Sequence, residues 1–331
     1  MTTKILGDAV QSVFVSGGSG FIGSHIVDLL LAGGYRVTAF DNLSNGREAF
    51  IEHHKSNPNF TFVKGDMLDL ELVKQHLAGH DLAWHMAANT DIIGCHEQPD
   101  RDLKDCLIAT FNMVEAMRCC GVRDILFAST GAVYGDLCHN NPTSESTGPL
   151  MPISCYAAGK IGSEAFISAY CHLYGLRGWM YRFGNVIGSR MTHGVIYDFI
   201  RKLKATPDHL EILGDGTQQK NYFLTEECIQ GICYGYQNIT MTEDHPCDVF
   251  NLGTDSVTPV TRIAELVIRE MGLEGKTRVT IQGAKRAWPG DQPRVHINVD
   301  RMRQHGWSAK LSSDQAVTTA IRRMLGKSDT I

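Results

Sequence analysis

The 331-residue sequence predicts an α/β fold in which a doubly wound parallel sheet is followed by a smaller α/β C-terminal domain. Short β-branched or apolar runs alternate with longer amphipathic stretches, which is typical of strand–helix–strand units whose sheet is covered on both faces. A glycine-rich segment separates the first apolar run from the first amphipathic stretch and predicts a tight strand-to-helix turn. The hydrophobic content of 43% is that of an ordinary globular protein.

The elements follow in order along the chain. Apolar runs predict strands at 13–15, 36–40, 60–63, 81–85, 124–128 and 178–183, and amphipathic stretches predict helices at 22–32 and 110–119. After about Asn185 the alternation gives way to loops, a turn at 214–216 and a helix at 261–271. We predict one domain over residues 1–180, with its core from about residue 12, and a second over 181–331 that exchanges segments with the first.

Composition narrows the classes of function. The formal net charge is −5, so the sequence offers no basic surface for nucleic acid. No apolar run approaches the ~18–20 residues that cross a bilayer. Residues 1–11 lack the basic and apolar regions of a signal peptide. We therefore expect a cytoplasmic protein with no membrane or nucleic-acid partner.

The chain has ten cysteines but no Cys-x-x-Cys pair. In a protein that is not secreted, this number fits reduced thiols better than a disulfide framework. Cys119, Cys120, Cys228 and Cys233 could be considered as zinc ligands, but their spacing does not match known zinc sites. We interpret these cysteines as core residues and predict no metal site.

Glycines recur as Gly17, Gly20 and Gly23 directly after the first predicted strand and at the start of a helix. Glycine in this position permits a tight turn and lets the N-terminus of the helix, here Phe21 and Ile22, approach a pyrophosphate. The motif alone is weak, but its strand–turn–helix setting favours a dinucleotide site.

Asp41 ends the second predicted strand, 18 residues beyond Gly23. A carboxylate there can accept hydrogen bonds from both adenosine ribose hydroxyls and would repel a 2′-phosphate, which favours NAD over NADP. The alternatives are a surface aspartate that starts the turn 41–43, or an NADP site assisted by Arg47.

Tyr156 and Lys160 lie four residues apart and share one face if the segment is helical. The ammonium is expected to lower the tyrosine pKa, so that the phenolate can act as a base. Thr130 follows the strand 125–128, and strand ends face the ligand crevice in open α/β sheets, so its hydroxyl could bind the reacting oxygen. The alternative is a half-buried tyrosine beside a solvated lysine.

Together these segments resemble the extended short-chain dehydrogenases that act on sugar nucleotides, the NAD-dependent epimerase/dehydratase family, and most closely its UDP-glucose (UDP-galactose) 4-epimerases. The resemblance runs from Val13 to about Trp307. It is carried by residues 17–23, 41–43, 65–66, 85–88, 129–135, 156–160, 182–185, 214–218 and 290–291. It implies a Rossmann-type NAD-binding domain followed by a nucleotide-sugar domain.

The resemblance also implies roles for individual residues. Tyr156 would be the base, Lys160 would hold the nicotinamide ribose, and Thr130 would assist at the sugar hydroxyl. The NAD site would comprise Gly17, Gly20, Phe21, Ile22, Gly23, Asp41, Asn42, Asp66, Met67, Ala87, Ala88, Tyr156 and Lys160. The substrate site would comprise Thr90, Thr130, Asn185, Lys220, Asp291 and Arg294.

The residues after Thr130 bear on the reaction. Related enzymes that dehydrate, decarboxylate or invert C3 and C5 need an extra acid, base or thiol there, whereas this chain has Gly131 and Ala132. This favours 4-epimerisation of a UDP-hexose through a 4-keto sugar. Open alternatives are a hexosamine, uronate or C2 epimerase, a dehydratase, an NAD-dependent dehydrogenase or reductase, and a dinucleotide sensor without chemistry.

Four positions depart from the family pattern. Lys220 and Trp288 stand where arginines are usual, Thr90 replaces a lysine, and Cys106 replaces an asparagine. We therefore expect Arg294 to carry more of the diphosphate binding.

Two further expectations concern histidines and assembly. His85, His139 and His193 are given no catalytic role, and His85 is expected to be structural at the end of a buried strand. The resemblance implies a homodimer formed through helices around 102–119 and 156–174.

Overall fold

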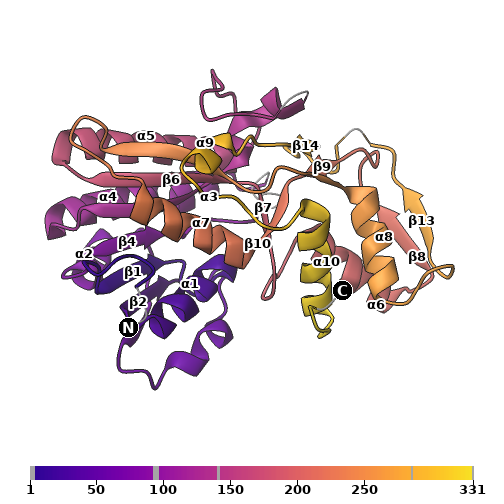
Figure 1. The fold of residues 1–331 in the computed structure, drawn as a ribbon, viewed down its shortest axis with the longest axis horizontal. Helices are drawn as coiled ribbons and strands as arrows, with labels where there is room; N and C mark the ends of the chain where they lie inside the picture. Colours follow the sequence, from indigo (N-terminus) through magenta and orange to yellow (C-terminus); the bar gives the residue numbers. More distant parts are fainter. Residues whose placement is uncertain (1–3, 92–96, 140–141, 285, 330–331) are drawn as a thin grey trace. The chain divides into compact units, whose positions relative to one another are not determined.

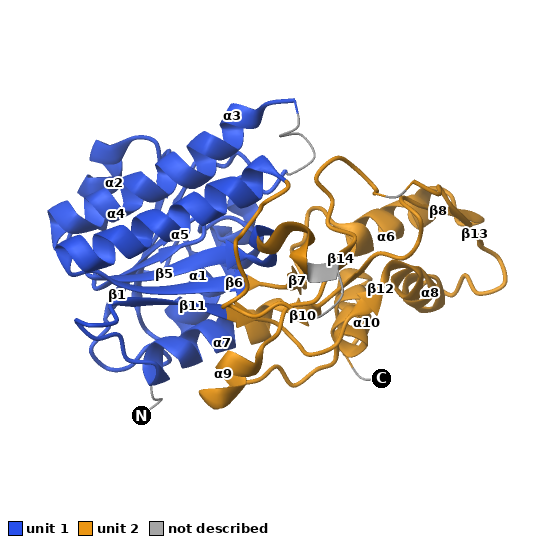
Figure 2. Cartoon of the chain, turned by 90° about the horizontal axis from the view of Figure 1, so that it is seen from above, with its two compact units in different colours: residues 1–133, 154–182, 229–250 blue, residues 134–153, 183–228, 251–331 orange. Residues whose placement is uncertain are grey.

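The computed structural model describes residues 4–91, 97–139, 142–284 and 286–329. The chain forms two compact units, which Figure 2 distinguishes by colour. Unit 1 comprises residues 1–133, 154–182 and 229–250, and unit 2 comprises residues 134–153, 183–228 and 251–331.

Unit 1 is built on a seven-stranded sheet with the order β11-β6-β5-β4-β1-β2-β3. The strands are β1 Ser12–Ser16, β2 Arg36–Asp41, β3 Phe60–Lys64, β4 Leu82–His85, β5 Asp124–Thr130, β6 Arg177–Phe183 and β11 Cys247–Leu252. Strand β1 pairs in parallel with both β2 and β4, and the strand order reverses between them. Ligands bind at such a reversal in open α/β sheets, outside the carboxyl ends of the strands. The predicted α/β fold class is confirmed.

Helices cover both faces of this sheet (Figures 1 and 2). Helices α2, α4 and α5 lie on one face, and α1 and α7 lie on the other. Their bounds are α1 Phe21–Ala32, α2 Leu70–Leu77, α3 Pro99–Asp102, α4 Ala109–Cys120, α5 Cys155–Tyr174 and α7 Thr225–Asn238. The first face has a continuous apolar core in which Phe14 and Ile125 of the sheet pack with Met113 and Ile167 of the helices. A π-helical turn, Leu103–Ile108, joins α3 to α4.

Short connections complete the described secondary structure of unit 1. Single 3₁₀ turns, η1 Glu48–Phe50 and η2 Glu52–His54, follow β2, and a longer 3₁₀ segment begins at Gly131 after β5. The six predicted strands and the two predicted helices of this unit are present within a few residues of their expected bounds, whereas α2, α3, α7 and β11 were not predicted.

Unit 2 combines three short sheets with four helices in its described part. Strands β7 Asn185–Ile187 and β10 Tyr222–Leu224 are parallel, as are β8 His209–Ile212 and β13 Arg278–Ile281. Strand β9 Gln219–Lys220 lies between β12 Thr258–Pro259 and β14 Arg294–Val295. The helices are α6 Val195–Ala205, α8 Val260–Glu270, α9 Asp300–Gln304 and α10 Ser313–Met324.

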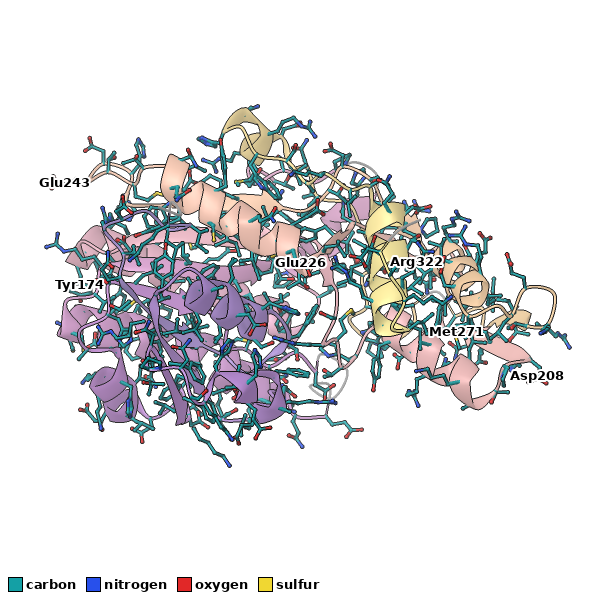
Figure 3. All side chains as sticks on the ribbon, turned by 60° about the horizontal axis from the view of Figure 1, so that its bottom comes forward. Tyr174, Asp208, Glu226, Glu243, Met271 and Arg322 are labelled. Atoms are coloured by element: carbon teal, nitrogen blue, oxygen red, sulfur yellow. The ribbon has the colours of Figure 1, made fainter. Side chains whose placement is uncertain are left out.

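Three of these helices enclose a second core. Phe199 of α6, Ile263 of α8 and Ile321 of α10 belong to it. Arg322, labelled in Figure 3, adds an ion pair between α10 and α8, with its Nε 3.2 Å from Glu270 Oε2. Its side chain and that of Glu270 are mostly buried, so solvent screens this pair less than an exposed one.

The cysteine interpretation was partly wrong. Cys228 and Cys233 are buried core residues, as expected, but Cys119 is exposed and Cys120 half-buried. Both lie at the end of α4, after Met117, which is the last buried residue of that helix. No helix in the described part of the chain has the length and apolar character to cross a membrane.

Candidate active site

The predicted site residues of unit 1 gather at the carboxyl edge of the sheet. Gly17 follows β1, Asp41 ends β2, Ala87 follows β4 and Thr130 ends β5. Parallel strands bring their carboxyl ends to one edge, so residues more than a hundred positions apart in sequence reach the same crevice.

The glycine turn allows close backbone approach. Gly17 has a φ of 69°, and a Cβ on it would lie 2.8 Å from the Ala87 nitrogen. A Cβ on Gly23 would lie 2.0 Å from the Gly17 carbonyl oxygen. Side chains at these positions would separate β1 from the segment after β4, and would separate the turn from α1.

The N-terminus of α1 is suited to binding an anion. Its N-cap is Gly20, which has no capping side chain, and its first turn, starting with Phe21 and Ile22, contains no acidic residue. The Ser19 hydroxyl is buried and has no hydrogen-bond partner among the described residues. Unpaired N–H groups and the helix dipole together favour a phosphate group at this end. This cradle fits the pyrophosphate of NAD.

Asp41 is 8% exposed and is held by backbone amides. Ser19 N donates to Asp41 Oδ2 over 2.9 Å, and Leu43 N donates to Oδ1 over 2.8 Å. Burial raises the pKa of Asp41, and these two hydrogen bonds lower it in part. Each carboxylate oxygen accepts about two hydrogen bonds, so both retain capacity for a ribose hydroxyl.

Replacing the charge on Asp41 should relax cofactor selectivity. We expect Asp41→Asn to weaken NAD binding by roughly ten- to a hundredfold, because hydrogen bonds to a charged acceptor contribute about 1.5–3 kcal/mol. Discrimination against NADP should shrink at the same time. Titrations of both dinucleotides measure this, with Asp208→Asn, an exposed site in unit 2, as the control. Unchanged discrimination would refute the ribose role.

The other predicted NAD contacts lie around the same edge. Asn42 and Asp66 are exposed and joined by a hydrogen bond of 3.2 Å between Asn42 Nδ2 and Asp66 Oδ2. Met67 is 6% exposed, and its side chain packs in the core of unit 1. Ala87 and Ala88 are half-buried after β4.

Tyr156 and Lys160 occupy successive turns of α5. The Ser154 hydroxyl caps this helix by accepting from Ala157 N over 3.2 Å, which places Tyr156 in the first turn. Lys160 is 2% exposed, and its Nζ lies 6.0 Å from the centre of the Tyr156 ring. Lys160 Nζ donates to the Ala128 carbonyl over 2.6 Å, which fixes the ammonium beneath β5.

The expected lowering of the Tyr156 pKa is wrong for this structure. Burial raises the pKa of Tyr156, and the neighbouring Cys106 and Asp102 raise it further. A hydrogen bond with the Thr130 hydroxyl acts in the opposite direction. The Lys160 ammonium is engaged with Ala128, and burial lowers its own pKa. Desolvation is therefore the dominant influence on the pKa of Tyr156.

A buried ion pair supports this part of α5 and was missed from the sequence. Glu164, one turn after Lys160, pairs with Arg182 of β6, and the two side chains are 8% and 6% exposed. Arg182 donates to both carboxylate oxygens, through Nη2 over 2.6 Å and Nε over 2.9 Å. Ser129 of β5 donates to Glu164 Oε1 over 2.5 Å. A Glu one helical turn after the Tyr-Lys pair was the available signal.

His85 is structural, as expected. It is fully buried, and Ser16 Oγ lies 2.6 Å from its Nδ1 while Thr110 Oγ1 lies 3.0 Å from its Nε2. Burial lowers the pKa of His85 to about 3, and the charge of Lys160 adds to this effect. The side chain of His139 is outside the described residues, and His193 is exposed in unit 2.

The depressed pKa of His85 predicts a pH-dependent stability. The unfolded chain takes up a proton below about pH 6.5, whereas the folded chain takes it up only near pH 3. The stabilisation is therefore complete above about pH 6.5 and is lost as the pH falls toward 3. When the pH is lowered from 7 to 5, we expect the free energy of unfolding to fall by about 2 kcal/mol less in His85→Gln than in the unmodified protein. Urea unfolding at both pH values measures this, and identical losses would contradict it.

The predicted substrate residues of unit 2 lie on short strands and a loop. Asn185 begins β7, Lys220 ends β9 and Arg294 begins β14. Asp291 is 3% exposed, and its Oδ1 lies 3.4 Å from Lys220 Nζ. Hydrogen bonds from Thr217 lower the pKa of Asp215, and the charge of the exposed Arg294 acts in the same direction. Thr90 is exposed in unit 1.

Arg286 is a cation whose position near the predicted substrate residues was not expected from the sequence. Its Nη2 lies 3.0 and 2.9 Å from the two carboxylate oxygens of Asp136, and its Nη1 donates to the Asp291 carbonyl. In the part of the chain that the structure describes, the buried indole N–H of Trp288 has no partner, and Lys220 Nζ lies 5.8 Å from the centre of its ring. Arg286 lies two residues before Trp288, which stands where the family usually has an arginine. This closeness in sequence could have pointed to Arg286.

Several known proteins are similar to this chain in sequence or in fold. UDP-glucose 4-epimerase of Mycolicibacterium smegmatis is 34% identical over 222 residues, which are 65% of this chain and 70% of that protein. UDP-glucuronic acid decarboxylase 4 of Arabidopsis thaliana is 29% identical over 265 residues, 78% of this chain and 57% of that protein. The solved complex of Thermus thermophilus UDP-glucose 4-epimerase with NAD has a TM-score of 0.81 and 29% identity, covering 95% of this chain and 99% of that one.

The family model described as the NAD dependent epimerase/dehydratase family matches residues 13–253, which is more than half of the chain. The glycine cradle at Gly17 and the carboxylate of Asp41 lie within this range and fit the cofactor that the family uses. The chain therefore belongs to the NAD-dependent epimerase/dehydratase family and is an NAD-dependent enzyme of nucleotide-sugar chemistry.

Proposed function

We propose that the protein is a nucleotide-sugar 4-epimerase of the UDP-glucose/UDP-galactose type. The observation that carries this proposal is the pairing of Tyr156 with Thr130, followed by Gly131 and Ala132. The first pair can move a proton at one carbinol, whereas the two residues after it have no side chain that can act as an acid, a base or a nucleophile.

Three residues of unit 1 have different roles at that carbinol. Bound NAD supplies the acceptor and donor for hydride exchange with the sugar. Tyr156 Oη takes the proton of the C4 hydroxyl and later returns it to the same oxygen, when the 4-keto sugar is reduced to the epimeric alcohol. Thr130 Oγ1 holds the same oxygen, and Lys160 supplies a positive charge behind the phenol. The N-terminal end of α5 favours the phenolate further, because Tyr156 lies in its first turn.

The raised pKa of Tyr156 is compatible with this role. The pKa is raised for the phenol in the protein without a bound cofactor. The positively charged nicotinamide ring of bound NAD would favour the phenolate beside it. We propose that binding of the cofactor, rather than Lys160 alone, brings the tyrosine into its working range.

Cationic groups of unit 2 suit the diphosphate of the substrate. Lys220, Arg286 and Arg294 are the candidates, and arginine can bind phosphate oxygens with two parallel hydrogen bonds. Lys220 and Arg286 are both anchored on Asp291, which limits their motion. We propose that this pair contributes more to binding than the exposed Arg294. Asn185, Asp291 and Thr90 remain proposed substrate contacts.

Other reactions of the family are the alternatives. The decarboxylase relative shows that this fold also supports decarboxylation, and a hexosamine, uronate or C2 epimerase would use the same proton-moving pair. An NAD-dependent dehydrogenase or reductase would release its reduced cofactor. A dinucleotide sensor without chemistry would need neither Tyr156 nor Thr130.

The test is a substrate screen without added cofactor. The purified protein is incubated separately with UDP-galactose, UDP-N-acetylgalactosamine and UDP-glucuronate, and the products are separated by chromatography while absorbance reports NADH. We expect conversion of UDP-galactose to its 4-epimer with no net NADH. Preferential conversion of another sugar would reassign the substrate, and stoichiometric NADH or a decarboxylated product would overturn the proposal.

We further propose a homodimer in the cytoplasm. Exposed apolar side chains of unit 1 lie on α5 and on the π-helical turn Leu103–Ile108, and Tyr174 at the end of α5 is labelled in Figure 3. The set is Leu103, Ile108, Phe166, Leu173 and Tyr174. Large exposed apolar groups on neighbouring helices are typical of interfaces. The free thiols of exposed Cys119 and Cys155 suit a reducing compartment. Sedimentation equilibrium tests the dimer, and a monomer at micromolar concentration would refute it.

A further inference from the structure

Two histidines and an aspartate of unit 1 converge away from the proposed active site. Asp28 lies in the middle of α1, and His53 and His54 end the 3₁₀ turn η2. His53 Nε2 lies 3.0 Å and His54 Nε2 lies 2.7 Å from the same atom, Asp28 Oδ1. The two imidazole rings are 4.0 Å apart at their centres.

These three groups form a donor set for a transition-metal ion. Two imidazole nitrogens and a carboxylate oxygen are ligands that zinc accepts, at about 2.0–2.2 Å from the ion. The three donor atoms lie within 4.8 Å of one another. Tetrahedral ligands at such bond lengths are roughly 3.3 Å apart. An ion would therefore need shifts of a few tenths of an ångström at the two N–O contacts and a modest closure between the imidazoles.

The surroundings allow this adjustment. The side chain of His53 is 52% exposed and can move, whereas that of His54 is 16% exposed and packs against Phe60, with ring centres 5.7 Å apart. Asp28 is anchored on a long helix and its side chain is 29% exposed. Two of the three ligands are thus held in place while the third can close over an ion.

The local charge does not oppose a cation. Lys55, the nearest cation in sequence to the two histidines, is paired with Glu48 over 3.0 Å and with Glu52 over 3.2 Å. Its charge is therefore neutralised locally, and the Asp28 carboxylate supplies a negative charge at the site itself.

We propose that Asp28, His53 and His54 bind one divalent transition-metal ion of the zinc type, with the remaining coordination position open to solvent. The ion would cross-link α1 to the turn η2 and so stabilise the folded state by mass action. The site is separate from the Tyr156 chemistry and does not depend on the proposed reaction. The site was not predicted from the sequence, because Asp28 is 25 residues from His53 and only the fold brings them together.

The test is calorimetric titration of the full-length, tag-free protein with Zn²⁺. We expect one saturable site in the unmodified protein, and at least a tenfold loss of affinity in His54→Ala and in Asp28→Asn. His172→Ala, an exposed histidine on α5, is the matched control and should bind Zn²⁺ like the unmodified protein. A saturating concentration of Zn²⁺ should also raise the melting temperature of the unmodified protein but not that of the two variants.

A second variant keeps the test decisive if His54→Ala or Asp28→Asn folds poorly. His53→Ala removes a half-exposed ligand and should preserve the fold while weakening Zn²⁺ binding by at least tenfold. The proposal is overturned if no saturable binding occurs, or if affinity is unchanged in the folded variants. The latter result would place the ion elsewhere, for example on the exposed thiols of Cys119 and Cys155.

Discussion

Tyr156→Phe is expected to lower kcat by about 10²–10⁴-fold, the range contributed by a positioned acid–base group. The phenylalanine ring fills the same space in the first turn of α5 but cannot take a proton from the sugar. NAD binding should persist, because the glycine turn at Gly17 and the carboxylate of Asp41 are untouched. Steady-state kinetics with UDP-galactose and a titration with NAD measure the two effects separately.

Tyr174→Phe is the matched control for this variant. Tyr174 lies at the other end of the same helix and is 52% exposed, so removal of its hydroxyl should leave kcat unchanged. Full activity in Tyr156→Phe would show that another group moves the proton. Loss of both activity and NAD binding would indicate a structural rather than a chemical role.

The second large effect concerns the ion pair between Glu164 and Arg182. We expect Glu164→Gln or Arg182→Met to lower the free energy of unfolding by about 3–5 kcal/mol, because each leaves a buried charge without its partner. The double variant Glu164→Leu/Arg182→Met should recover part of this loss, since apolar side chains often replace a buried pair without penalty. Urea unfolding of the three variants gives the comparison.

An exposed pair supplies the control for these variants. Lys104 Nζ lies 2.7 Å from Asp100 Oδ2, and both side chains are more than half exposed. Lys104→Met should change stability by less than about 1 kcal/mol, the usual limit for a surface pair. If single variants at Glu164 and Arg182 cost no more than this one, the buried pair does not hold α5 to β5 and β6.

The fold of unit 1 was predictable because local signals and global topology agree there. The run 36–40 became β2 Arg36–Asp41, and the helix predicted at 110–119 became α4 Ala109–Cys120. The position of β11 beside β6 was not predictable, because pairing between distant strands leaves no periodic signal in either one. The π-helical turn Leu103–Ile108 was missed for a similar reason, since its helix period is nearly that of its neighbours.

The position of the Tyr-Lys pair could be predicted from the sequence, but its electrostatics could not. Spacing placed Tyr156 and Lys160 on one face of a helix, as the structure has them. Sequence could not reveal that Lys160 Nζ is taken by the Ala128 carbonyl and that burial raises the pKa of Tyr156. Such shifts depend on the depth of each group and on partners from other strands, which only the folded chain defines.

The contacts of the cationic groups in unit 2 could not be predicted from the sequence either. The resemblance to the family predicted that Arg294 binds the diphosphate, and Arg294 is exposed in the structure. Arg286, which was not predicted, contacts Asp136 and Asp291. A loop residue has no periodicity that would fix its direction, so its partners emerge only from tertiary structure.

The most direct test of the proposed chemistry follows the hydrogen at C4 of the sugar. The protein is incubated with UDP-galactose that carries deuterium at C4, without added cofactor, and the UDP-glucose formed is examined by NMR and mass spectrometry. Transient oxidation by retained NAD predicts that the deuterium remains on C4 of the product, because the same hydrogen is returned to the same carbon. Loss of the deuterium to solvent, or its appearance in free NADH, would contradict the proposed 4-epimerase mechanism.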